Sequence, residues 1–114
     1  MKIVTNEKTF PVCIENPDIE KLLDDMCPID YEFKRAGHEY YTRMNHSLPQ
    51  NELKMESLLK ENTINYFDGW HAVSIIFETT DIAPHEVAAI GFVEGSLNEI
   101  LKNEKDSVVL HFEK

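Results

Sequence analysis

Hydrophobic and polar residues alternate along much of this chain, which is the pattern of β-strands with one face toward a core. Turn-forming residues separate the alternating segments. The predicted strands are Lys2–Thr5, Thr9–Ile14, Ile29–Arg35, His38–Arg43, Ile64–Phe67, His71–Glu78, Val87–Val93 and Ser107–Glu113. In the last of these, the alternation predicts that Val108, Leu110 and Phe112 point inward.

Two segments have helical spacing instead. Asn16 followed by Pro17 is a helix start signal, and the segment Pro17–Met26 carries one apolar stripe. The stripe consists of Ile19, Leu22, Leu23 and Met26. A second, shorter helix is predicted over Ser96–Leu101, where Ser96 and Glu99 have the spacing of a capping box.

The central part of the chain contains both the clearest turn signal and the segment whose secondary structure is hardest to predict. Asp68-Gly69 predicts a tight two-residue hairpin turn. The strand that follows, His71–Glu78, is apolar on both faces, which predicts a position in the middle of the structure. Gly91 predicts a bulge or a close backbone approach. Asn51–Leu59 fits both periodicities, and we interpret it as a loop with a short helix or a poor strand.

Short strands with two short amphipathic helices predict a mainly β fold of a single domain over residues 1–114. Closing the sheet into a barrel of about eight strands would remove the exposed edges that invite aggregation. We expect the two helices to cover the open ends of that barrel.

Composition and charge limit the classes of partner, compartment and cofactor that we expect. The formal net charge of −10, with only Arg35 and Arg43 as arginines, argues against nucleic acid binding. No run approaches a membrane span and the first residues lack a signal-peptide core, so we expect a cytoplasmic protein. Cys13 and Cys27 are predicted to be free thiols. No paired Cys/His spacing indicates a metal, and no cofactor is predicted.

Four stretches in this order resemble the small bacterial cyclophilin-like domains. The stretches are TFPVCIENPDIEKLLDDMCPIDYEF (9–33), GHEYY (37–41) with Leu48-Pro49 after it, INYFDGWHAVSIIFE (64–78), and IGFVEGSLNEIL (90–101) with VVLHFE (108–113). The resemblance implies an eight-stranded barrel with capping helices. It does not imply an activity, because most relatives of this class have no assigned function.

The resemblance also does not carry over the isomerase site of true cyclophilins. That site has a Phe-His-Arg run before a Gln-Gly-Gly turn, and this sequence contains neither. Arg43 is the nearest counterpart of the arginine that polarises the twisting amide.

The candidate site is therefore a groove of aromatic and polar residues rather than a catalytic motif. The candidate ligand-binding residues are Tyr41, Arg43, Tyr66, Trp70 and His85, the last in the loop 79–86. Histidine can act as an acid or a base near neutral pH, which makes His71 and His85 the best polar candidates. Neither has a nucleophile or second base beside it in sequence.

Three functions remain open from the sequence. The first is a non-enzymatic domain that binds a peptide or small ligand in the aromatic groove. The second is a weak peptidyl-prolyl isomerase that uses Arg43. The third is an accessory protein-interaction module that uses an outer face of the barrel, with an oligomeric state that the sequence leaves open.

Overall fold

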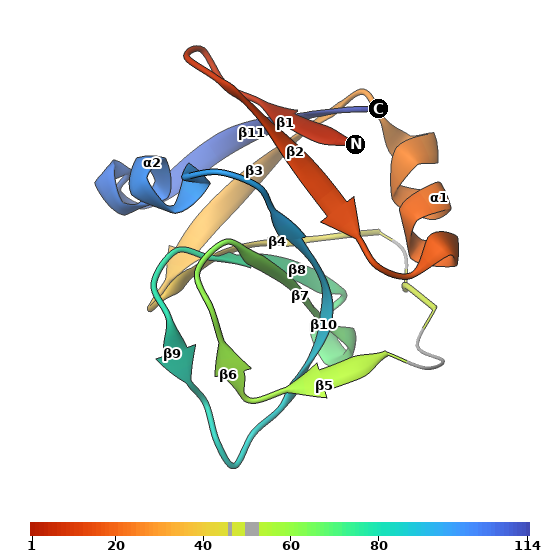
Figure 1. Cartoon of the computed structure of the whole chain (residues 1–114), viewed down its shortest axis with the longest axis vertical. Helices are drawn as coiled ribbons and strands as arrows, with labels where there is room; N and C mark the ends of the chain where they lie inside the picture. Colours follow the sequence, from red (N-terminus) through yellow and green to blue (C-terminus); the bar gives the residue numbers. More distant parts are fainter. Residues whose placement is uncertain (46, 50–52) are drawn as a thin grey trace.

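The computed structural model describes residues 1–45, 47–49 and 53–114, and its elements follow the predicted order closely (Figure 1). The strands are β1 (Lys2–Val4), β2 (Thr9–Ile14), β3 (Ile29–Ala36), β4 (Glu39–Arg43), β5 (Lys54–Glu56), β6 (Leu58–Leu59), β7 (Thr63–Phe67), β8 (Ala72–Ile76), β9 (Thr80–Asp81), β10 (Val87–Val93) and β11 (Ser107–Glu113). The helices are α1 (Pro17–Met26), a 3-10 turn η1 (Asp68–Trp70) and α2 (Leu97–Asn103). Neither α-helix in the described ranges has the length and apolar character to cross a bilayer.

Eight antiparallel strands of the described chain close into a barrel, as predicted. Their order is β2-β1-β11-β3-β4-β8-β7-β10, and β10 returns to pair with β2. One edge of β10 is shared, because Val87–Ala89 pairs with β5 whereas 91–93 pairs with β2. The register against β7 shifts between Ala89 and Gly91, which confirms the predicted bulge. A side chain on Gly91 would overlap the carbonyl oxygen of Cys13, so the strands require glycine at this position.

The barrel interior is a continuous hydrophobic core. Its largest fully buried side chains are Tyr40, Tyr66, Phe33 and Phe77. From β11, Leu110 is buried, and Phe112 is half-buried but stacks on Phe33 with ring centroids 6.0 Å apart. The inward face predicted for this strand is therefore correct. The two cysteines are free, as predicted, and both are partly buried.

The two helices lie on opposite sides of the barrel and contribute Ile19, Leu97 and Leu101 to its core (Figure 1). At the start of α1, the side chain of Asn16 accepts hydrogen bonds from the backbone N–H groups of Asp18 and Ile19, at 2.9 and 3.2 Å. This confirms the predicted N-cap, with proline at the first helical position.

The predicted capping box of α2 is wrong. Ser96 occupies the N-cap position but makes no side-chain capping bond. Instead, Asn62, from the connection between β6 and β7, accepts a hydrogen bond from the N–H of Asn98 at 2.8 Å. Its amide nitrogen donates to the carbonyl of Gly95 at 3.2 Å and to Asn98 at 2.8 Å. A partner distant in sequence satisfies the exposed donor at this helix end, so the local motif is not needed.

Two other predictions need correction. The described part of 51–59 forms the short strands β5 and β6, so the helical alternative is wrong there. The hairpin turn between β7 and β8 contains four residues rather than two, since Phe67 pairs with Ala72. Asp68–Trp70 forms a 3-10 turn, and His71 closes it in the left-handed conformation with φ of 50°. Trp70 therefore lies in the turn between β7 and β8, where 60% of the residue is exposed.

The two short strands β6 and β9 pair with each other and form what we call the β6–β9 ribbon. A second small cluster of buried residues joins Leu59 of this ribbon to Ile76 of β8 and Val87 of β10, with Ile82 packed against them. Ile76 faces this cluster rather than the main core. This explains why β8 is apolar on both faces: one face lines the barrel and the other is covered in part by the ribbon.

Candidate functional site

The outer face of β4 and β8 carries a groove made of two adjoining hollows, of about 260 and 210 Å³. The first is lined by Ala36, Glu39, Tyr41, Phe67, Trp70, Ala72 and Ser74. The second shares Ala36, Glu39, Phe67 and Ser74 and continues to Leu59, Ile82 and Val87 beside the β6–β9 ribbon. We call the two hollows together the outer groove.

Strand period and register explain why these side chains meet. Glu39, Tyr41 and Arg43 alternate on β4, so they lie on one face, and Tyr41 is directly opposite Ser74 of β8. On the other side of β8, Phe67 of β7 is opposite Ala72. The small side chains Ala72 and Ser74 form a low floor between larger neighbours. The ribbon covers one end of this face and leaves the rest open.

Two large aromatic side chains at the outer groove are unusually open to solvent. Phe67 is 54% exposed and Trp70 is 60% exposed. Large aromatic side chains are usually buried, so two exposed ones beside one hollow make this face the candidate site. The guanidinium of Arg43 lies 5.0 Å from the centroid of the Trp70 ring, a cation–π geometry.

Among the described residues, Glu39 is the acidic side chain that lines the groove. Partial burial raises the pKa of its carboxyl group, although a hydrogen bond with Ser74 and the nearby His38 act in the opposite direction. His38 also lines the second hollow and lies 3.8 Å from Glu78. A half-buried carboxylate loses part of its hydration, so a cationic partner would stabilise it.

The structure brings together some of the residues predicted from sequence and separates others. Tyr41 and Trp70 line the first hollow, and Arg43 lies against Trp70. Tyr66 is 1% exposed and belongs to the barrel core. His85 is exposed and lines neither hollow.

Tyr66 has a structural role that its place in the core explains. Its hydroxyl oxygen accepts a hydrogen bond from the N–H of Leu48 at 3.2 Å, and Leu48 is itself buried. The residue thus fixes the segment that follows β4 to the barrel. His71 is exposed and shapes the turn that carries Trp70, and His46 lies outside the described residues.

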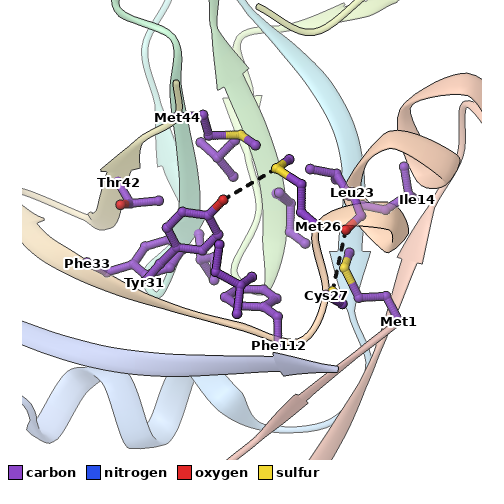
Figure 2. Close-up of a pocket in the computed structure, with 14 residues that line it drawn as sticks. Met1, Ile14, Leu23, Met26, Cys27, Tyr31, Phe33, Thr42, Met44 and Phe112 are labelled. Atoms are coloured by element: carbon purple, nitrogen blue, oxygen red, sulfur yellow. Dashed lines mark hydrogen bonds between the residues drawn. The ribbon is translucent and has the colours of Figure 1, made fainter. Parts of the chain in front are cut away.

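A second cavity, of about 40 Å³, lies inside the barrel beneath α1 (Figure 2). Its lining includes Met1, Met26, Met44, Cys27, Tyr31 and Phe112. The Tyr31 hydroxyl points at the sulfur of Met26, 3.6 Å away (Figure 2). Burial raises the pKa of Tyr31, with a smaller contribution from Cys27.

The side chains around this inner cavity are mainly apolar, so they pack the core rather than bind a polar ligand. Cys27 donates to the carbonyl oxygen of Leu23 at 3.4 Å, and burial, with Asp24 next, raises the pKa of its thiol. A thiol with a raised pKa is a poor nucleophile at neutral pH. Methionine side chains commonly fill irregular gaps in a core, which is their role here.

The candidate ligand-binding residues named from the sequence do not include Glu39 or Phe67, which both line the groove. Glu39 is one of 21 acidic residues, and nothing around it in sequence sets it apart. For Phe67, the alternation of side chains along a strand was a usable signal. Neighbouring residues of a strand point to opposite faces, so Phe67 must face away from Tyr66.

Comparison with known proteins supports the fold and adds no activity. A model of the cyclophilin-like family matches residues 3–113. No curated protein matches the chain at a significant level. In the part of the chain that the structure describes, no group of three or more His, Cys, Asp or Glu residues could hold a metal ion.

Proposed function

Since this chain belongs to the cyclophilin-like family over almost its whole length, we propose that its barrel is a scaffold for binding a peptide segment in the outer groove. The observation that carries the proposal is the exposure of Phe67 and Trp70 beside a concavity with a carboxylate in it. Exposed aromatic anchors and a few placed polar groups are the usual components of a recognition site.

The shape of the groove favours a chain over a compact molecule. Its two hollows adjoin through four shared residues, and together they run from Trp70 to the β6–β9 ribbon. An extended peptide places alternate side chains on the same side, so two neighbouring hollows can each take one.

Binding, unlike catalysis, also requires no nucleophile or general base in the groove. Ser74 is 9% exposed and its described partner is a carboxylate, not a histidine base. The prolyl isomerase alternative depends on Arg43, which is exposed and lies over Trp70. An arginine that polarises an amide gains most of its effect in a water-excluded pocket, which is the reason we place binding first.

The experiment is a chemical-shift titration of the 15N-labelled protein. The probes are capped pentapeptides Ac-Gly-Ala-X-Ala-Gly-NH2, with each amino acid in turn as X. We expect saturable shifts at the amides of Glu39, Tyr41, Phe67 and Trp70 for a subset of X. Trp70→Ala should abolish them, whereas Phe92→Ala, which removes an aromatic residue that is 39% exposed outside the groove, should not.

Shifts that map elsewhere, or no saturable shift for any X, would refute groove binding. The proline peptide also tests the alternative: cis–trans exchange faster than the uncatalysed rate, and lost in Arg43→Ala, would establish an isomerase. The third hypothesis, an accessory protein-interaction module, stays a prediction. Self-association measured by sedimentation would favour it over ligand binding.

A further inference from the structure

We propose that the outer groove selects a positively charged residue, and specifically that a lysine side chain of the bound peptide pairs with Glu39. This inference deepens the proposed function and rests on it. It concerns the chemistry of the occupant, which neither the family match nor the fold determines.

The first support is the position of Glu39. It is the one acidic side chain that lines both hollows among the described residues, and it lies on the groove surface opposite Ile76 of β8. Burial there raises the pKa of its carboxyl group, so the ionised form lacks full solvation. An incoming ammonium group would restore that lost stabilisation through a charge-assisted hydrogen bond.

The second support is the aromatic surround. Tyr41, Phe67 and Trp70 border the same hollow as Glu39. Aromatic faces attract cations, and several rings around one carboxylate are a common arrangement for alkylammonium recognition. The chain already shows this attraction, because the guanidinium of Arg43 lies over Trp70.

The third support is the number of acceptors. The carboxylate of Glu39 and the hydroxyl of Ser74, which interact with each other, line the first hollow. A lysine ammonium group has three donors at one point, whereas a guanidinium has five in a planar fork. A single carboxylate with one hydroxyl suits the ammonium, and the aliphatic stem of lysine can lie along Phe67.

The fourth support is the charge of the whole molecule. The formal net charge is −10, which raises the encounter rate of cationic peptides and disfavours anionic ones. This field acts over the entire surface, so it cannot by itself select the groove. The test must therefore separate the general field from the local carboxylate.

The experiment uses Trp70, the single tryptophan of the chain, as a fluorescent reporter inside the groove. The probes are Ac-Gly-Ala-Lys-Ala-Gly-NH2, the same peptide with acetyl-lysine, and n-butylammonium chloride alone. We expect the lysine peptide to bind about tenfold more tightly than the acetyl-lysine peptide, in line with one charged hydrogen bond. Glu39→Gln should reduce that ratio to about threefold or less.

The control is Glu7→Gln, which removes the same charge from an exposed position between β1 and β2. The preference for lysine should survive in this variant. A loss equal to that of Glu39→Gln would mean that the general field, and not the groove, selects the cation, and would overturn the inference. Circular dichroism of both variants establishes that they fold.

The other outcomes are also decisive. Equal affinity for the lysine and acetyl-lysine peptides, with shifts still in the groove, leaves the proposed function standing and refutes the charge preference. No change at Trp70 with any peptide refutes both. Binding of n-butylammonium as tight as that of the lysine peptide would show that a free amine, rather than a peptide, is the occupant.

Discussion

Tyr40 and Tyr41 are neighbours on β4, yet they belong to different parts of the molecule. Tyr40 is fully buried, tilts against Phe77 at a centroid distance of 5.4 Å, and donates its hydroxyl hydrogen to the carbonyl of Lys105 at 3.0 Å. Tyr41 is half-buried and borders the outer groove. The same amino acid in the same strand therefore packs into the barrel core on one face and borders an open groove on the other.

The difference shows where this fold keeps its stability. The inner face needs no partner to bury its largest side chains, because Tyr40, Tyr66, Phe33 and Phe77 are each at most 1% exposed. The outer face contains exposed rings and a poorly solvated carboxylate, which are features that cost stability in the free protein. Features of that kind are retained at sites of function more often than elsewhere.

The largest difference in stability is expected when each of the two tyrosines is truncated to alanine. Tyr40→Ala should lower the free energy of unfolding by ~3–5 kcal/mol, because it opens a cavity in the core. Tyr41→Ala should lower it by less than about 1 kcal/mol, as for most partly exposed sites. Urea denaturation of both variants measures the contrast, and similar losses would mean that the groove face is part of the core.

A smaller effect is expected at the ribbon that covers one end of the outer face. Leu59→Ala should cost about 2–3 kcal/mol, at the low end for a buried leucine, because its cluster is small. Hydrogen exchange should quicken in β6 and β9 and stay slow in β3 and β11. Leu58→Ala is the control, since this side chain is 48% exposed and its loss should change stability little. Uniformly faster exchange would show that the ribbon is integral to the barrel.

The hydroxyl groups of the two tyrosines give a finer contrast. Tyr40→Phe should lower the free energy of unfolding by about 1 kcal/mol, because the carbonyl of Lys105 loses its donor. Tyr41→Phe should leave stability almost unchanged. Thermal unfolding followed by circular dichroism distinguishes the two, and an unchanged Tyr40→Phe variant would mean that water replaces the hydroxyl.

The smallest effect concerns Glu39 and depends on pH. Its folded-state pKa is raised, so the folded protein binds this proton more tightly than the unfolded chain. The contribution of Glu39 is therefore fully present below the ordinary glutamate pKa and is lost as pH rises through the raised value. Glu39→Gln should remove this part of the pH dependence and leave the protein as stable as the parent at pH 7, or more so.

Denaturant titrations between pH 4 and pH 8 measure this dependence, with Glu7→Gln as the control for net charge. If Glu39→Gln were clearly less stable at pH 7 and kept the parental slope, Glu39 would be stabilised by its surroundings. The picture of a carboxylate awaiting a cationic partner would then be wrong.

Much of the barrel could be predicted because each strand carries its own information. Alternation in Thr9–Ile14 and Ser107–Glu113 indicates both the strand and its buried face, and Asn16-Pro17 marks the start of α1 from local chemistry alone. These signals depend on neighbours in sequence, so one sequence is enough to read them.

The candidate site was only partly predictable, because it depends on which strands become neighbours. The sequence predicts Tyr41 and Trp70 as ligand-binding residues, and both line the first hollow. It also predicts Tyr66, which is buried and shares the inner face with Ile64. Glu39 becomes distinctive only when β8 is placed beside β4 and the ribbon is placed over Ile76. The capping of α2 by Asn62 likewise joins positions 36 residues apart.

Asn62 also connects three separate elements of the molecule. Its backbone N–H donates to Ile76 at 2.7 Å, its carbonyl accepts from Val93 at 2.7 Å, and its side chain holds the first turn of α2. The short loop between β6 and β7 therefore joins β8, β10 and the start of α2 through one residue. Displacement of this loop would therefore break hydrogen bonds to β8, β10 and α2 together.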